Sequence, residues 1–353
     1  MLPWGRPVCR CFLRRQHRWC LLLALAAALA LPILVLTGIF EEHLSFFLAP
    51  FLRGSSGSAL QRPVSGVDSY QIANSGACRG PDPPFLLCLV VSAPSHFQSR
   101  QAIRQTWGRT RELGGLGIRR LFVLGDPQAP EVQAQLEQES VEHKDLVQGT
   151  FHDTYRNLTL KTLMLLRWAG TFCPEALFLL KVDDDVFVNM KGLVDHLRGL
   201  GSARPEGIYL GRIHWGVRPI RDPTSRYYTS EAAFSGDRFP LYCSGTAYVV
   251  SRDVAWRVSA VALETPIVAL EDVYMGICAR KVGVAPQHSA WFSGSTQYPL
   301  DPFCYRCIFT SHRMTPTMME KAWALLAPDR EGGCSWLLGR LALVRCKLLS
   351  WLT

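Results

Sequence analysis

The feature that most constrains the fold is an apolar segment, residues 177–189, that contains three consecutive aspartates. Its first half is rich in large and β-branched residues and predicts a buried strand. Asp183, Asp184 and Asp185 follow at the carboxyl end of that strand, where ligands bind in open α/β sheets. Adjacent carboxylates are costly in a core without a counter-charge, whereas their oxygens suit a divalent cation that bridges to a diphosphate. The alternative is a solvated acidic turn between two strands.

A second apolar run, residues 19–40, contains no charged residue. As a helix it would be roughly 33 Å long, which is enough to cross a bilayer. Arginines precede the run and Glu41 and Glu42 follow it, so we expect a transmembrane helix with a cytosolic N-terminus and the rest of the chain in the lumen. A cleaved signal peptide is the alternative, although the run exceeds the usual signal core of about 7 to 15 residues.

Composition then divides the chain into segments. The length of 353 residues fits two to three average domains or one large α/β unit. Beyond the span, Gly, Ser and Pro are frequent up to residue 84, which is typical of a stem that holds a folded domain away from a membrane. The sequence predicts a cytosolic tail at 1–18, the span at 19–40, a stem at 41–84 and a folded domain at 85–353.

The positive charge has a local origin. The formal net charge is +9, and residues 1–62 contain seven Arg and two Glu, so more than half of the excess lies around the predicted span. Basic residues do not alternate with aromatic ones as they do on nucleic-acid-binding surfaces, so we expect no nucleic-acid partner.

The cysteines indicate an oxidising compartment. Of twelve, three lie before or at the start of the predicted span and nine follow it. In a lumen most of these nine would pair, and at least one would stay free because their number is odd. Cys304-x-x-Cys307 is similar to half a zinc site or a redox pair, but no second such motif accompanies it, so we favour structural disulfides here.

Hydrophobic patterning predicts alternating strands and helices. The expected strands are 85–91, 121–126, 177–182 and 242–251, and the expected helices are 99–107, 131–142, 157–169, 190–200, 252–262 and one that starts near 271. The order strand, helix, strand near the start favours a βαβ unit. Residues 201–239 show little periodicity, and irregular stretches of this length are usually functional or disordered.

Two further features could belong to a site. Arg100 and Arg104 lie four residues apart on one helical face and could clamp a phosphate or nucleotide, or serve as surface ion-pair partners. Glu271 and Asp272 begin a predicted helix, where the helix dipole favours acids, so a plain acidic first turn is the alternative to a functional role.

Taken together, six blocks resemble the β-1,3-galactosyltransferase and β-1,3-N-acetylglucosaminyltransferase family, whose members are type II membrane enzymes of the Golgi. The blocks, in the family's order, are Arg100–Trp107, Phe122–Gly125, Asp153–Thr162, Lys181–Asn189, Tyr242–Gly245 and Glu271–Gly276. Within the family, members that act on gangliosides are most similar, through residues 155–163, 298–301, 310–313 and 334–336. The chain departs from the family pattern at Thr150, Thr246-Ala247 and Arg226-Tyr227, and the last two departures fall near the expected acceptor side.

The resemblance implies a GT-A fold, a single Rossmann-like α/β domain that binds UDP-galactose and Mn²⁺. By the same resemblance, Asp185 ligates the metal and His312 completes its shell, although a surface histidine is the alternative for His312. The residues implied for donor binding are Arg100, Arg104, Trp107, Lys161, Asp183 and Asp184.

The resemblance also implies an inverting transfer in which Asp272 accepts the acceptor's proton. Expected acceptor contacts are Trp215, Tyr242, Ser244, Gly245 and Glu271. The expected reaction adds galactose in β-1,3 linkage to a terminal β-N-acetylgalactosamine of ganglio-series glycolipids. Alternatives are galactosyl or N-acetylglucosaminyl transfer to glycoproteins or other glycolipids, or a non-catalytic lectin or chaperone of the same fold.

Asn157-Leu158-Thr159 is the sequence's single N-glycosylation sequon. A lumenal location would make Asn157 a glycosylation site. Because the sequon begins a predicted helix, an unglycosylated N-cap is the alternative.

Overall fold

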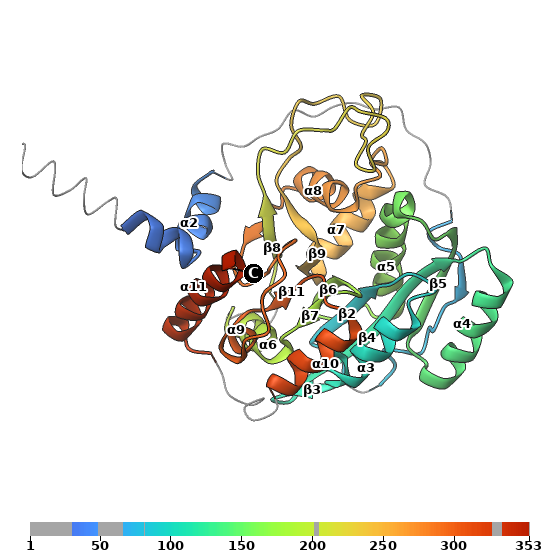
Figure 1. Ribbon diagram of the computed structural model, residues 1–353. Coiled ribbons are helices and arrows are strands. Elements are labelled where there is room, and N and C mark those ends of the chain that lie inside the picture. Colours follow the sequence, from blue (N-terminus) through green and yellow to red (C-terminus); the bar gives the residue numbers. More distant parts are fainter. Residues whose placement is uncertain (1–29, 49–65, 81, 201–204, 327–333, 353) are drawn as a thin grey trace, which may run out of the picture.

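The computed structural model describes residues 30–48, 66–80, 82–200, 205–326 and 334–352 (Figure 1). A nine-stranded mixed sheet has the order β1-β5-β4-β2-β6-β9-β8-β10, with β3 paired to β4, and β7 and β11 form a separate antiparallel pair. The strands are β1 (Tyr70–Ile72), β2 (Leu86–Val91), β3 (Glu112–Leu113), β4 (Leu116–Asp126), β5 (Leu146–His152), β6 (Phe178–Asp183), β7 (Phe187–Val188), β8 (Tyr209–His214), β9 (Tyr242–Ser251), β10 (Gln287–His288) and β11 (Thr310–Ser311).

Helices cover both faces of this sheet (Figure 1). They are α2 (Ile39–Leu48), α3 (Phe97–Gln105), α4 (Pro130–His143), α5 (Leu158–Phe172), α6 (Met190–Gly199), α7 (Arg252–Ala262), α8 (Glu271–Lys281), α9 (Pro302–Cys307), α10 (Pro316–Leu325) and α11 (Trp336–Leu352). Side chains of β2 alternate between two cores, since Leu86 and Val90 pack with α3, α6 and α10, whereas Leu87 and Leu89 pack with α5, α7 and α8.

The centre of the sheet confirms the expected α/β class. Strands β5, β4, β2 and β6 are mutually parallel, and every residue of β2 is buried because helices cover both faces. Val91 pairs with Asp183, so β2 and β6 end level and the aspartates emerge at a shared carboxyl edge. Strand β9 lies antiparallel beside β6 and brings the segment around Gly245 to the same edge.

The predicted boundary between stem and folded domain at residue 85 is wrong. Strand β1 pairs antiparallel with β5 and covers the edge of the sheet, and Val67 is buried. A disulfide joins Cys78 to Cys173 at the end of α5. Sequence composition missed this because a short edge strand carries little hydrophobic signal of its own. Residues 49–65 of the predicted stem lie outside the described residues.

Most of the predicted transmembrane span, 19–29, also lies outside the described residues. Residues 30–36 are helical and α2 then starts at Ile39 as a separate helix, so the apolar run does not continue as one helix to residue 40. Gly38 separates the two helices with a φ of +75°, which favours glycine, and an added Cβ would clash with Ala290. Within the described parts of the chain, no helix is both long and apolar enough to cross a membrane.

Disulfides fix the C-terminal region. Cys304 is bonded to Cys346 and Cys307 to Cys334, which ties α9 to α11 and to the segment before it. The prediction of structural disulfides at the Cys304-x-x-Cys307 motif is confirmed, and the two cysteines have different partners. Among the described cysteines, the free ones are all buried; they are Cys88, Cys243 and Cys278.

Candidate active site

The three consecutive aspartates at the end of β6 point to different partners. Asp184 is buried and turned away from the sheet edge, where its Oδ2 accepts hydrogen bonds from Ser92 Oγ at 2.6 Å and from His96 Nδ1 at 2.9 Å. Asp183 and Asp185 remain more open, with side chains 34% and 45% exposed. Only these two therefore offer oxygens toward a ligand.

Asp183 belongs to a buried charge cluster centred on Lys181. The Lys181 ammonium lies 2.7 Å from Asp183 Oδ1 and 3.5 Å from Glu271 Oε2, and it also donates to the carbonyl of Gly245. Burial alone lowers the pKa of Lys181, but the two carboxylates more than offset this and hold it above its ordinary value. Burial, with a smaller contribution from Asp185, raises the pKa of Asp183 to about 6.

Asp185 faces a histidine from the far end of the chain. Pairing of β11 with β7 brings His312 next to the aspartates, and its Nε2 lies 3.2 Å from Asp185 Oδ2. Burial lowers the pKa of His312, but the hydrogen bond and charge of Asp185 outweigh burial and raise it overall. Carboxylate and imidazole are both metal-ligand types, and here they converge from two loops. No group of three or more His, Cys, Asp or Glu suited to a metal occurs among the residues described.

The first turn of α8 presents Asp272. Its Oδ1 accepts from Val273 N at 2.8 Å and its Oδ2 from Gly245 N at 3.2 Å. Burial and the neighbouring Glu271 raise the pKa of Asp272 to about 6. Glu271 itself is buried and occupied, since Tyr248 donates its hydroxyl to Glu271 Oε1 at 2.7 Å. Of the two acids at this helix start, Asp272 is therefore the one whose hydrogen bonds come from backbone amides alone.

Gly245 lies between Lys181 and Asp272, because its carbonyl accepts from Lys181 and its amide donates to Asp272. A Cβ built on it would come 3.0 Å from Glu271 Oε2 and 3.3 Å from Asp272 Cβ, so the strand can approach the helix this closely only without a side chain. Ser244 next to it is buried and hydrogen-bonds Thr246 Oγ1 at 3.2 Å. The backbone at Gly245 thus positions both Lys181 and Asp272.

Most of these groups border one cavity of about 460 Å³, and Asp185 lies next to it through its contact with His312. The acids Asp183, Glu271 and Asp272 line this cavity together with His312, and its other lining residues include Tyr242, Ser244 and Gly245. Its outer wall is basic and aromatic: Arg226 stacks over the ring of Tyr155 at 4.3 Å and over that of Tyr227 at 5.1 Å. Arg218 and Arg313 also line the cavity. This combination of carboxylates inside and cations at the wall suits a polar, negatively charged ligand with sugar hydroxyls.

A second cavity of about 330 Å³ adjoins the first, because His214, Val217 and Ser295 line both. Trp215 lines the second cavity and not the first, and the second cavity extends to Glu41 of α2. Its floor is held by polar contacts, since Glu41 lies 3.1 Å from Arg212 and 3.3 Å from His288.

Comparison with known proteins identifies the family. Residues 98–290 match the family model described as Galactosyltransferase, which is more than half of the chain. The chain belongs to the galactosyltransferase family. The β-1,3-galactosyltransferase 4 of Mus musculus is 41% identical over 89% of this chain and 92% of its own length. The protein of the same name from Homo sapiens is 39% identical over 96% and 99%. A human lactosylceramide 1,3-N-acetyl-β-D-glucosaminyltransferase is 38% identical over 69% of this chain and 66% of its own length.

The protein is therefore a glycosyltransferase, an enzyme that takes a nucleotide-sugar donor and a glycan acceptor. Membership in the galactosyltransferase family confirms the family resemblance drawn from the sequence. The family model covers the segment from α3 to the residues after β10, and the residues that line the main cavity fall within it except Ser295, His312 and Arg313.

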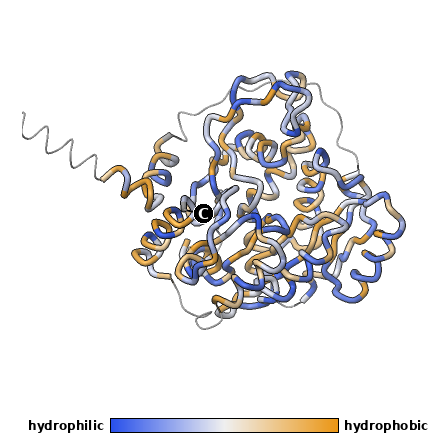
Figure 2. The backbone as a smooth tube through the Cα atoms, in the orientation of Figure 1, coloured by the Kyte–Doolittle hydropathy of each residue, from blue (hydrophilic) through white to orange (hydrophobic). Residues whose placement is uncertain are grey.

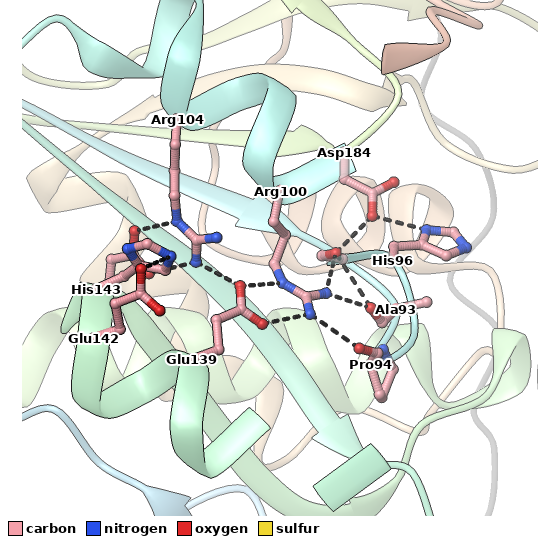
Figure 3. Close-up of polar contacts among 11 residues, drawn as sticks. Ala93, Pro94, His96, Arg100, Arg104, Glu139, Glu142, His143 and Asp184 are labelled. Atoms are coloured by element: carbon pink, nitrogen blue, oxygen red, sulfur yellow. Dashed lines mark hydrogen bonds and ion pairs between the residues drawn. The ribbon is translucent and has the colours of Figure 1, made fainter. Parts of the chain in front are cut away.

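Some residues expected at the donor lie elsewhere in this glycosyltransferase. Arg100 is completely buried, pairs with Glu139 in a two-pronged contact of 2.9 and 2.7 Å, and donates to the carbonyls of Ala93 and Pro94 (Figure 3). Arg104 contacts the same Glu139 and also Asp145, which lies at 2.8 Å. Neither guanidinium lines the cavity, which favours a structural role for both.

Trp107 and Lys161 are also buried behind the cavity. Trp107 has no exposed surface and lies in the core beneath α3. Lys161 reaches Asp153 at 2.7 Å and the carbonyl of Ser92 at 2.8 Å. Because Ser92 also contacts Arg100 and Asp184, these residues support the aspartate loop from behind.

Asn157 occupies the N-cap position of α5, but its side chain makes no capping hydrogen bond. Its amide donates to the carbonyl of His152 at 2.9 Å instead, and Thr159 of the sequon is buried with its hydroxyl on the carbonyl of Val268. The side chain of Asn157 therefore does not cap α5 by a hydrogen bond. Glycosylation of Asn157 stays a prediction.

Sequence reasoning missed the central role of Lys181 and the place of Arg218 and Arg313 in the basic wall, and it noted Arg226 only as a departure from the family pattern near the expected acceptor side. A charged residue inside an otherwise apolar strand was a usable signal for Lys181, because a buried lysine needs acidic partners. Arg218 and Arg226 lie in the stretch without periodicity, where nothing local indicates which way a side chain points.

Proposed function

We propose that this enzyme transfers galactose from UDP-galactose, with inversion, in β-1,3 linkage to a terminal β-N-acetylgalactosamine. The observation that carries the proposal is that one cavity holds two separate chemical groups. His312, which lies 3.2 Å from Asp185, lines the cavity, and so does Asp272, whose pKa is raised to about 6. A single-displacement transfer needs a metal-binding pair and a base that are separate groups, because the leaving group departs opposite the attacking hydroxyl. The names of relatives about 40% identical support galactose as the sugar.

The residues fit a manganese ion that is shared with the donor. Asp185 and His312 offer one oxygen and one nitrogen at 3.2 Å from each other, which leaves coordination positions for diphosphate oxygens and water. Bound there, Mn²⁺ would neutralise the diphosphate of the leaving group as the sugar C–O bond breaks. Asp183, fixed by Lys181, is oriented toward the rest of the donor.

Asp272 is the proposed general base. Its carboxylate would take the proton from the acceptor's 3-hydroxyl while that oxygen bonds to the anomeric carbon of galactose and UDP departs. The pKa of about 6 leaves Asp272 ionised near neutrality yet more basic than an ordinary aspartate. The amides of Gly245 and Val273 fix the carboxylate in place. Glu271, already bonded to Tyr248, would orient the acceptor side.

We further propose that the acceptor is a ganglio-series glycolipid and that the enzyme is a type II, single-pass protein of the Golgi membrane. The apolar run before α2 supports membrane anchoring. The second cavity supports a membrane-linked acceptor, because it leads from the reaction site to Glu41, close to where that run enters the folded domain. Trp215 and Tyr242 offer aromatic surfaces along this path, as sugar rings require.

The proposal is tested with the full-length enzyme in detergent, Mn²⁺, and acceptors that end in β-N-acetylgalactosamine, galactose or N-acetylglucosamine on lipid or peptide carriers. UDP-galactose and UDP-N-acetylglucosamine are supplied in parallel, because one relative is named as an N-acetylglucosaminyltransferase. We expect UDP release only with UDP-galactose and the N-acetylgalactosamine glycolipid. Transfer from UDP-N-acetylglucosamine would reassign the donor, and binding without UDP release would favour a lectin.

A further inference from the structure

The last helix, α11, exposes an apolar stripe. Leu337, Leu341, Leu348 and Trp351 are 62%, 52%, 42% and 72% exposed. They are spaced by four, seven and three residues, so they share one face of the helix, and Val344 completes the row. The opposite face is apolar as well, with Ala342 and Leu343 in the core, so α11 is hydrophobic nearly all round. Such helices are normally covered on every side or lie in lipid.

The helix cannot turn to hide this stripe. The disulfide from Cys346 to Cys304 fixes its inner face to α9, and Arg345 holds Asp301 at 2.7 Å. Figure 2 shows the apolar character of α11 and of the neighbouring α2 on the same side of the molecule. The exposed row is therefore a permanent part of the surface.

Helix α11 also contacts the chain where the apolar run enters the folded domain, beside α2 (Figure 1). Lys347 Nζ donates to the carbonyl of Val35 at 2.8 Å, and Arg340 Nη1 donates to the carbonyl of Thr37 at 3.0 Å. Val35 lies at the end of the helix at residues 30–36 and Thr37 directly follows it, and the carbonyl of Val35 also accepts from Gly38 N at 3.1 Å. Arg340 also pairs with Glu42 of α2. The exit of the apolar run is thus fixed against α11 by three contacts.

Residues at this exit are themselves exposed and apolar. Leu31 and Ile33 are 50% and 59% exposed, and Phe47 of α2 is 64% exposed. The surface formed by α11, α2 and residues 30–36 therefore offers apolar side chains from three segments, and residues 30–36 are the described end of the run that we propose to cross the membrane. A protein partner on this surface would have to occupy the space that the membrane fills around that run.

We propose that α11 lies in the interfacial layer of a phospholipid bilayer and holds the catalytic domain directly against the membrane. This inference rests on the membrane anchoring in the proposed function. Tryptophan, basic residues and an apolar stripe together are the composition of interfacial helices. Arg340, Arg345 and Lys347 border the stripe, and Arg345, with 55% of its side chain exposed, is the one of the three that can also meet headgroups. The second cavity, which ends at Glu41 of α2, is then held close to lipid, so a glycolipid headgroup reaches it without leaving the bilayer.

Site-specific photocrosslinking in the full-length chain tests the proposal. A benzophenone amino acid replaces Leu337 or Trp351, and the protein is reconstituted in vesicles of phosphatidylcholine with one fifth phosphatidylserine that contain radiolabelled phospholipid. The matched control is Val141 of α4, which is 77% exposed and far from α11. We expect lipid adducts at positions 337 and 351 and none at 141. Adducts only to a second copy of the chain, or no excess of lipid adducts over position 141, would overturn the proposal.

A second measurement separates this proposal from the proposed function. The double variant Leu337→Ser, Trp351→Ser should transfer galactose to a soluble acceptor sugar at the wild-type rate and to glycolipid in vesicles several-fold more slowly. Equal rates on vesicle glycolipid would contradict the interfacial role of α11. If the wild type transferred galactose to neither acceptor, the proposed function would be rejected instead. The crosslinks would still report on the position of α11. Resistance of the chain to carbonate extraction, without crosslinks from α11, would leave the anchor in place and reject the interfacial helix.

Discussion

Two clusters of charged residues lie on either side of the aspartate loop, and they differ in how completely they are paired. Behind the loop, Arg100 and Arg104 satisfy Glu139 and Asp145 through short, mostly buried contacts. In front of it, Asp272 borders a cavity together with His312, which pairs with Asp185, and the Asp272 carboxyl is left with a raised pKa. A fully paired cluster has no capacity left for a ligand. The contrast teaches that incomplete pairing beside a cavity, more than charge itself, marks the reactive part of this enzyme.

The largest expected effect comes from the front cluster. Asp185→Ala should lower turnover about 10³-fold, because metal-assisted neutralisation of a leaving group is worth several kcal/mol. Manganese-dependent binding of UDP, followed by calorimetry, should disappear with it. Asp184→Asn serves as the control, since Asp184 faces Ser92 and His96. If Asp184→Asn abolished UDP binding while Asp185→Ala did not, the two roles would be exchanged.

The back cluster should respond in stability. Arg100→Leu leaves Glu139 buried with only Arg104 as a partner, so unfolding should be easier by about 3 kcal/mol, toward the lower end for broken buried pairs. Denaturant titration measures this change, and the exposed Arg109→Leu should alter stability by less than about 0.5 kcal/mol. The KM for UDP-galactose should stay close to that of the wild type. A large rise in KM at unchanged stability would show that Arg100 contacts the donor after all.

The pH dependence of turnover should report the front cluster. Because burial raises the pKa of Asp272 to about 6, this carboxylate can accept a proton above that pH and is itself protonated below it. Turnover at saturating substrate should be flat above pH 7 and fall about tenfold per unit well below pH 6. Asp185 raises the pKa of His312, which is a proposed metal ligand, so saturating Mn²⁺ is kept throughout. A turnover profile that stays flat down to about pH 4 would contradict the raised pKa of Asp272.

The smallest effect should come from an exposed pair that belongs to neither cluster. Lys191 and Asp195 form an i,i+4 pair on α6 with side chains 29% and 44% exposed. Lys191→Ala should change the free energy of unfolding by less than about 0.5 kcal/mol, because solvent screens the pair. A loss comparable with that of Arg100→Leu would mean that exposure does not explain the difference between the clusters.

The sequence predicted the parts of this fold whose signals are local. The apolar strands β2, β6 and β9 and the helices between them lie within a few residues of their expected positions, because burial on both faces leaves a continuous apolar run. Strand β1 was missed, as was β8 inside the stretch expected to be irregular, because their pairing partners lie far along the chain.

For the site, the sequence predicted which residue types take part, and the structure showed which way each side chain points. Asp183, Asp185, Asp272 and His312 were expected near a ligand and lie around one cavity or next to it. Arg100 carried an equally strong sequence signal, but its guanidinium points into the protein. Spacing along a helix tells which side chains share a face, and only packing tells whether that face meets solvent or a buried glutamate.

The central claim is that the metal side and the base side of the cavity are separate, and Asp272→Asn tests it most directly. The amide keeps the shape of the carboxylate but cannot accept a proton. Turnover and the Kd of UDP in saturating Mn²⁺ are measured on the same full-length preparation. The account predicts a loss of about 10² to 10⁴-fold in turnover with UDP affinity nearly unchanged. A parallel loss of UDP affinity, or a larger kinetic loss for Glu271→Gln than for Asp272→Asn, would contradict it.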